Sequence, residues 1–158
     1  MNATKHYPRA VTTRTLLHRG QPHALVGDGH VLEALRSALG VTSLARGCST
    51  GLCGACRVLV DGAPVNTCTA KVVDLTDGAT LELYEDLETD PASVTAVAAF
   101  TAERPTRCTL CVPSIGVTAV SLARRGLSGD ADAVDDALRT AACMCTGRGS
   151  LRRALLTK

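Results

Sequence analysis

The spacing of the cysteines constrains this chain more than any other feature of its sequence. The first four follow the pattern C-x4-C-x2-C-x11-C, and they are Cys48, Cys53, Cys56 and Cys68. Three glycines, Gly47, Gly51 and Gly54, are interleaved with them. Residues without a Cβ allow several backbone N–H groups to approach anionic sulfur closely. Core or disulfide-bonded cysteines have no reason to keep this spacing, so we expect a metal centre here.

The kind of metal centre follows from the ligand chemistry. The first three spacings match the plant-type ferredoxin pattern, in which four thiolates hold a 2Fe–2S cluster. Zinc is the alternative for four thiolates, although structural zinc sites more often use two C-x2-C pairs. The spacing therefore favours a 2Fe–2S cluster.

The composition limits the function of the chain. Its 158 residues suffice for one ordinary domain or two small ones. Tyr7, Tyr84 and Phe100 are its only aromatic residues, so stacking on nucleic-acid bases is excluded, and a net charge of +2 indicates no polyanionic partner. Metal-type cysteine spacing indicates a reducing compartment. With neither a secretory signal nor an apolar run of membrane-spanning length, we expect a soluble, cytoplasmic protein.

The first half of the chain has the pattern of an α+β domain. Residues 11–17 and 23–26 predict a β-hairpin, and Asp28 is the expected N-cap of a helix that ends at Gly40. Residues 57–60 and 63–66 predict a second hairpin turned by Asp61-Gly62, which would return Cys68 to the cysteine loop. Residues 80–84 predict a last strand. This order favours a β-grasp domain over residues 9–84.

The second half of the chain has a helical pattern. An acidic run of Glu82, Glu85, Asp86, Glu88 and Asp90 ends at Pro91, and it is interpreted as a solvated face and, over residues 85–90, as a linker. Beyond it, helices are expected from the Asp90-Pro91 cap through Glu103, from Pro113 to Arg125, over residues 131–141, and from a Thr146 cap onward. Residues 91–158 therefore predict a four-helix bundle.

A second set of four cysteines lies in this helical half. Cys108, Cys111, Cys143 and Cys145 have the spacing C-x2-C-x31-C-x-C. Each pair precedes a predicted helix, and two helix N-termini aimed at one point would favour an anionic cluster. Zinc is again the alternative, although a C-x-C pair is unusual for zinc. A redox-active dithiol at Cys108 and Cys111 fits less well, because the expected βαβ context is missing.

The two cysteine sets together resemble those of one enzyme family. A ferredoxin-like domain followed by a helical domain with these spacings is similar to the iron–sulfur subunit of the molybdenum hydroxylases. That family includes xanthine dehydrogenases, aldehyde oxidoreductases and aerobic carbon monoxide dehydrogenases. The likeness covers about residues 11–156, and it is closest at residues 47–48, 51–56, 58–62, 65–68 and 145–147.

The resemblance implies an electron relay. A large subunit with molybdenum and a pterin would deliver electrons to a 2Fe–2S cluster held by Cys108, Cys111, Cys143 and Cys145. A second cluster, on Cys48, Cys53, Cys56 and Cys68, would pass them to FAD in a medium subunit. The chain has no Gly-rich dinucleotide fingerprint after a strand and no acid–base constellation, and its four histidines are expected at the surface.

This chain departs from the family pattern around the second cysteine set. Family members usually have Gln-Cys-Gly-x-Cys-x-Pro-Gly and Cys-Arg-Cys-Thr-Gly-Tyr. Here the departures are Arg107, Thr109, Ser114, Met144 and Arg148, while all four cysteines are kept. The family Gln contacts the pterin, and the last cysteine accepts a hydrogen bond from it. By the resemblance, Arg107 and Cys145 are therefore the residues that face the pterin cofactor.

Two other functional classes are consistent with the residues. One is a ferredoxin-like electron carrier, or a relay subunit of a dehydrogenase without molybdenum. The other is a structural zinc protein without a redox role. Zinc–thiolate sites are colourless and iron–sulfur sites are coloured, so a visible spectrum separates the zinc protein from the rest.

Overall fold

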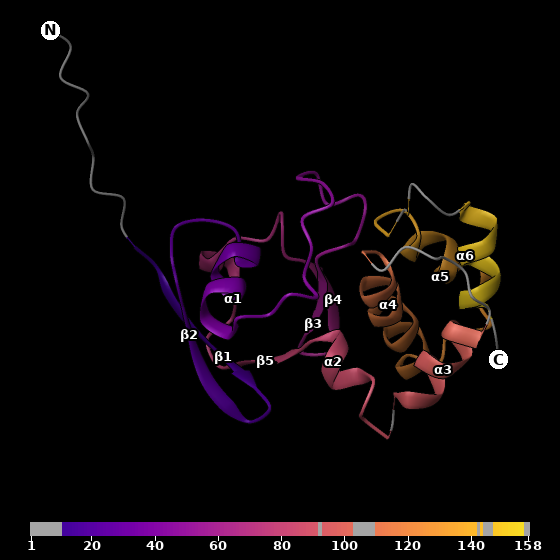
Figure 1. Ribbon diagram of the computed structural model, residues 1–158, viewed down its shortest axis with the longest axis horizontal. Helices are drawn as coiled ribbons and strands as arrows, with labels where there is room; N and C mark the ends of the chain where they lie inside the picture. The colour runs from indigo at the N-terminus through magenta and orange to yellow at the C-terminus, as the bar shows by residue number, and fades with distance from the viewer. Residues whose placement is uncertain (1–10, 92, 103–109, 142, 144–146, 157–158) are drawn as a thin grey trace, which may run out of the picture.

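The computed structural model describes residues 11–91, 93–102, 110–141, 143 and 147–156. Within these ranges it has one five-stranded sheet and six α-helices, which is the α+β class expected from the sequence. The strands and helix α1 (Val31–Leu39) lie at one end of the molecule, and the helices after residue 93 lie at the other (Figure 1). In the part of the chain that the structure describes, no helix is long and apolar enough to cross a membrane.

The sheet is built from two hairpins joined by a central strand. Its strands are β1 (Thr13–His18), β2 (Gln21–Val26), β3 (Arg57–Val60), β4 (Ala63–Asn66) and β5 (Ala79–Glu82), in the spatial order β2-β1-β5-β3-β4. Strand β5 runs parallel to β1 and antiparallel to β3. It ends two residues earlier than the sequence predicts, because Leu83 is the N-cap of a short helix.

The turn of the β3–β4 hairpin has the backbone geometry that its sequence predicts. Asp61 and Gly62 have φ angles of 49° and 75°. Positive φ at both central residues defines the type I′ turn, whose twist matches that of the flanking strands. The hairpin pairs Arg57 with Asn66 at its open end, so the residues before β3 and after β4 meet there.

Helix α1 packs its apolar face against the sheet. Val31, Leu32 and Leu35 are completely buried, and Gly40 ends the helix with the left-handed φ of 64° that its sequence position predicts. The expected N-cap was wrong, because His30 rather than Asp28 occupies that position and no side chain caps the helix.

The start of α1 is satisfied by a distant segment instead of a cap. The N–H groups of Val31 and Leu32 donate to the carbonyl oxygens of Ala70 and Thr67, at 2.9 and 3.0 Å. The first N–H groups of a helix have no partner within the helix, so these bonds replace a side-chain cap. They also tie α1 to the segment that carries Cys68.

Four helices form the second half of the described chain: α3 (Val94–Ala102), α4 (Val112–Arg124), α5 (Ala131–Ala137) and α6 (Arg148–Leu155). Helix α3 contacts α4 and α6, and α5 contacts the same two helices. All four occur where the sequence predicts helices, although α3 begins later and α5 ends earlier than expected. Thr146 and Glu103, two expected helix ends, lie outside the described residues, and Gly147 is the N-cap of α6.

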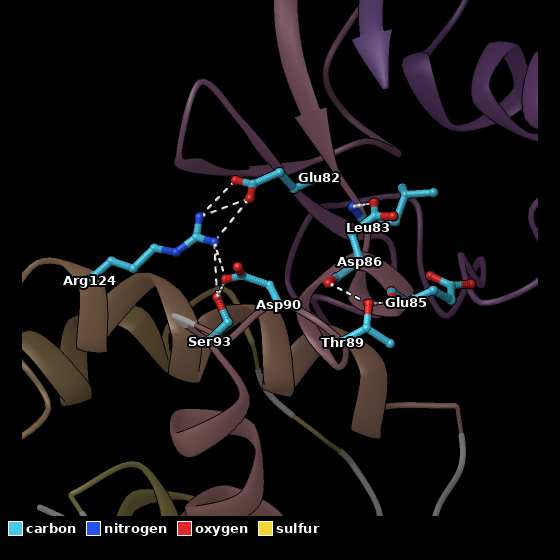
Figure 2. A network of polar contacts seen from close by, with 8 residues as sticks. All are labelled: Glu82, Leu83, Glu85, Asp86, Thr89, Asp90, Ser93 and Arg124. Atoms are coloured by element: carbon cyan, nitrogen blue, oxygen red, sulfur yellow. Dashed lines mark hydrogen bonds and ion pairs between the residues drawn. The ribbon is translucent and has the colours of Figure 1, made fainter. Parts of the chain in front are cut away.

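The acidic run is a packed junction between the two halves, which corrects its interpretation as a solvated face. Residues 84–87 form the short helix α2 (Tyr84–Leu87), in which both end residues are buried. Arg124, at the end of α4, donates through Nη1 to Glu82 at 2.8 Å and through Nη2 to Asp90 at 3.2 Å and Ser93 at 2.9 Å (Figure 2).

A second polar contact ties the junction to the first hairpin. Asp86 lies 2.9 Å from His18 Nε2 and 2.6 Å from Arg19 Nε. Burial raises the pKa of Asp86, but the N–H of Leu83 and the side chains of Arg19 and His18 outweigh burial and hold that pKa below its usual range. The expectation that His18 is a surface residue was wrong, because its side chain is 13% exposed.

An apolar cluster joins the two halves behind these ion pairs. It is formed by Leu59, Tyr84, Leu87, Val97, Val117 and Val120. Helix α4 reaches Tyr84 because it has Gly116 at the contact, where an added Cβ would lie 2.4 Å from Tyr84 Cε2. The two halves are therefore in direct side-chain contact around Tyr84.

We predict that Gly116→Ala destabilises the chain by about 1–3 kcal/mol, because the new methyl group would overlap the buried ring of Tyr84. The change is measured as a lower midpoint of urea unfolding. Gly129→Ala is the matched control, since no atom lies within 4 Å of its added Cβ. An equal loss in both variants would contradict close packing at Tyr84.

Candidate metal centre

The first cysteine set lies in the loop between α1 and β3 and at the end of the β3–β4 hairpin. Cys56 and Cys68 are each 1% exposed and belong to the core between α1 and the sheet, whereas Cys48 and Cys53 are half-buried. The hairpin returns Cys68 to the loop, as the sequence predicts. The N–H of Cys68 lies 3.3 Å from Cys56 Sγ, and Thr67 Oγ1 donates to the Cys56 carbonyl at 2.8 Å.

The four thiols are arranged as two adjacent pairs. Cys48 contacts Cys53 through a side-chain hydrogen bond, and Cys56 contacts Cys68 in the same way. A structural zinc ion needs four ligands around one point, whereas a dinuclear cluster divides four thiolates between two irons. The pairing fits a dinuclear centre better.

Backbone N–H groups point at these sulfur atoms, which is the role that the interleaved glycines predict. Cys48 accepts from the N–H groups of Cys53 and Thr50, Cys53 accepts from Ala55, and Cys68 accepts from Gly51. Such donors stabilise sulfur that carries negative charge. Gly47 is required for close approach, because an added Cβ would lie 2.9 Å from Cys53 Sγ.

The pKa values of Cys48 and Cys68 are shifted in opposite directions. The N–H groups of Cys53 and Thr50 lower the pKa of Cys48 to about 6 against the opposing effect of burial. Burial, together with the neighbouring Cys56, raises the pKa of Cys68 to about 12. Four adjacent thiolates repel one another, so this set can be fully ionised only when a cationic centre binds it.

The second cysteine set is described only in part. Cys111 is the N-cap of α4 and is 6% exposed, and Cys143 is 8% exposed. Both belong to the apolar core formed by the second-half helices. Cys108, Cys145 and Arg107 lie outside the described residues. The structure thus brings one cysteine of each sequence pair into the same core.

The family departures that the structure describes both have local partners. Ser114 is buried in the first turn of α4, where its hydroxyl donates to the Cys111 carbonyl at 3.0 Å. Arg148 is exposed and donates to the carbonyl oxygen of Asp135 at 2.8 Å. Thr109 and Met144 lie outside the described residues.

A polar junction that no sequence pattern predicts connects the two cysteine regions. Arg57 follows Cys56 directly, and its Nη2 donates to Thr140 O and Oγ1, both at 2.6 Å. Asn66 Nδ2 donates to Gly51 O at 2.6 Å and to Thr140 O at 3.2 Å. The cysteine loop and the segment before Cys143 therefore share hydrogen-bonding partners.

The same junction is also closely packed. A Cβ on Gly54 would lie 2.9 Å from both Ala141 Cα and Thr140 O. Hairpin register could have placed Arg57 beside Asn66, but no local signal indicates that Thr140, far along the chain, meets both.

Comparison with known proteins identifies relatives over most of the chain, although no protein-family model matches it. The nicotinate dehydrogenase small FeS subunit of Eubacterium barkeri is 31% identical over 130 residues, which cover 81% of this chain and 82% of that subunit. The nicotine 6-hydroxylase small subunit of Paenarthrobacter nicotinovorans is 32% identical over 124 residues, which cover 78% and 74%.

Solved structures show the same likeness in three dimensions. Quinoline 2-oxidoreductase from Pseudomonas putida 86 matches with a TM-score of 0.75 and 25% identity, over 94% of this chain and 92% of that one. Aldehyde oxidoreductase from Desulfovibrio desulfuricans matches with a TM-score of 0.77 and 29% identity, over 91% of this chain and 16% of that much longer one. The chain therefore belongs to the small iron–sulfur subunits of oxidoreductase complexes in the molybdenum hydroxylase family.

Proposed function

We propose that the chain is the electron-transfer subunit of a heteromeric hydroxylase or dehydrogenase, and that it holds two 2Fe–2S clusters between a molybdenum–pterin subunit and an FAD subunit. The observation that carries this proposal is the paired, N–H-lined arrangement of Cys48, Cys53, Cys56 and Cys68. When bound, such clusters supply one-electron transfer. We place the complex in the cytoplasm, because thiolate sites persist in a reducing compartment.

Each thiol pair of the first site would hold one iron, with Cys48 and Cys53 on one side and Cys56 and Cys68 on the other. The N–H groups directed at the sulfur atoms support this assignment, since hydrogen bonds to the sulfurs stabilise a negatively charged cluster. The two buried thiols, Cys56 and Cys68, lie on the side of the apolar core. The burial of this side keeps water away from one face of the site.

The second site would be held by Cys108, Cys111, Cys143 and Cys145. Burial of Cys111 and Cys143 in one apolar core supports it. So does the position of Cys111 at the N-terminus of α4, where the helix dipole favours thiolate. We propose that Arg107 and Cys145 face the pterin of the large subunit, and that the loop of Cys48 and Cys53 faces the flavin.

In domain terms, we propose a ferredoxin-like β-grasp domain over residues 9–84, a connection over residues 85–90, and a four-helix iron–sulfur domain over residues 91–158. One apolar core lies within the first range, and a second lies within the third. A third apolar core, around Tyr84, is shared by both domains.

We predict about four iron atoms and little zinc per purified chain, with two electron paramagnetic resonance signals after reduction. Cys53→Ser should remove one signal and Cys111→Ser the other, because each breaks one ligand set. The matched control is Thr69→Ser, beside the first loop, which should keep both. About two iron atoms with zinc in the other site would contradict the proposal for that site.

A chain ending at Asp90 is predicted to bind one cluster, since all four ligands of the first site lie before that point. It should unfold at a lower temperature than the full chain, because Leu59, Tyr84 and Leu87 lose their contacts with α3 and α4. Iron content and thermal unfolding test both parts. A colourless fragment would show that the first site needs the helical domain.

We predict that Arg107→Ala slows electron transfer within the complex, or weakens its assembly, while both clusters remain. An arginine supplies a charged, planar donor that suits a cofactor phosphate or a partner carboxylate. Stopped-flow reduction by substrate and the molybdenum and flavin content of the purified complex measure the effect, with Arg153→Ala as the surface control. If neither molybdenum nor flavin co-purifies with the unaltered chain, its partner is another kind of dehydrogenase.

A further inference from the structure

Arg57 is a buried cation that, among the residues the structure describes, donates hydrogen bonds only to neutral groups. Only 5% of the residue is exposed. Its guanidinium donates to Asn66 Oδ1 at 2.9 Å, Thr118 Oγ1 at 2.9 Å, and the carbonyl and hydroxyl oxygens of Thr140 at 2.6 Å. Within the described residues, no carboxylate forms an ion pair with it. Arg57 and Asp136 both line one open cavity, but the carboxylate of Asp136 is 79% exposed and pairs with Arg139.

A buried charge without a countercharge is strongly unfavourable, so the balancing negative charge must be found nearby. Thr140 O, which accepts from Arg57 Nη2 at 2.6 Å, also lies 2.9 Å from the position of a Cβ on Gly54, the residue after Cys53. The guanidinium therefore lies against the cysteine loop, where the thiolates of the proposed first cluster would supply the balancing negative charge. With four thiolates, a 2Fe–2S cluster is a dianion when oxidised and a trianion when reduced.

We propose that the fixed positive charge of Arg57 raises the reduction potential of the cluster held by Cys48, Cys53, Cys56 and Cys68. A cation at a fixed position stabilises the more negative, reduced state more than the oxidised state. This inference rests on the proposed function, because it requires a redox-active cluster at the first site.

The polar junction explains why this charge stays in place. Arg57 donates to acceptors in three separate segments: Asn66 at the end of β4, Thr118 in α4, and Thr140 after α5. Thr140 lies three residues before Cys143, so the bonds that orient the guanidinium also hold the second cysteine region against the first. The charge is therefore held at the contact between the two cysteine regions, on the residue that follows Cys56.

The test is a redox titration of the full-length, iron-loaded chain, monitored by the electron paramagnetic resonance signals of both clusters. In Arg57→Met the first cluster should become harder to reduce. The ratio of its reduced to oxidised form at one fixed potential should fall by about tenfold, as expected for the loss of one unit charge. The second cluster should change less, and the iron content should not change. Arg57→Lys, which keeps the charge, should change the ratio less than Arg57→Met does.

Arg125→Met is the matched control, because Arg125 lines the same cavity but is exposed to solvent. Arg125→Met removes an equal charge and should leave the ratio of reduced to oxidised form of both clusters unchanged. An unchanged ratio of reduced to oxidised first cluster in an Arg57→Met chain with full iron content would overturn the proposal. So would an equal shift in the Arg125→Met control.

Arg57→Gln covers the case in which Arg57→Met does not load iron, and the same criterion applies to it. If both neutral variants lose the first cluster while Arg57→Lys keeps it, the site requires the positive charge, which supports the proposal. If Arg57→Lys also loses it, Arg57 serves folding alone and the proposal is overturned. An unaltered chain without iron would instead refute the proposed function.

Discussion

The register of the β3–β4 hairpin is the constraint on which the two cysteine regions depend. Pairing of Arg57 with Asn66 places Cys56 and Cys68 side by side at the open end of the hairpin. It also directs the side chains of Arg57 and Asn66 to the helical half. A slip of one residue would exchange the faces of the strand, remove Leu59 from the shared core and turn Arg57 away from Thr140. The type I′ turn at Asp61-Gly62 fixes this register locally, so a two-residue turn determines the geometry of a site at the opposite end of the hairpin.

The two halves are held together by contacts of different physical kinds. An apolar cluster around Tyr84 excludes water, the ion pairs of Arg124 close its edge, and the hydrogen bonds of Arg57 lie near the cysteine loop. Ion pairs of partly exposed groups contribute little to stability, so burial around Tyr84 supplies most of the free energy that joins the halves. The polar contacts instead fix orientation. This combination suits a protein in which two sites must keep a constant separation.

The sequence predicts the elements whose signals are local and misses those that depend on distant contacts. Both hairpins, the Gly40 helix end and four helices beyond residue 90 follow from turn residues and periodicity. Helix α1 lacks the expected Asp28 cap because a segment forty residues away accepts its N–H bonds. The acidic run looked solvent-exposed because the arginine that pairs with it, Arg124, lies on α4. Cysteine spacing predicted the proximity of Cys56 and Cys68, but no pattern could have indicated Thr140 as a partner of Arg57.

The close approach of Tyr84 to Gly116 has a spectroscopic consequence. The chain has no tryptophan and two tyrosines, of which only Tyr84 is within the described residues. Its ring is buried at the boundary of the two halves, where packing makes it rigid and asymmetric. Near-ultraviolet circular dichroism in the tyrosine band is usually a crowded average over many chromophores, whereas here two tyrosines contribute and the Tyr84 contribution reports on this boundary. In the apoprotein, where iron–sulfur absorption does not mask that band, the contribution of Tyr84 follows the docking of the helical half onto the sheet.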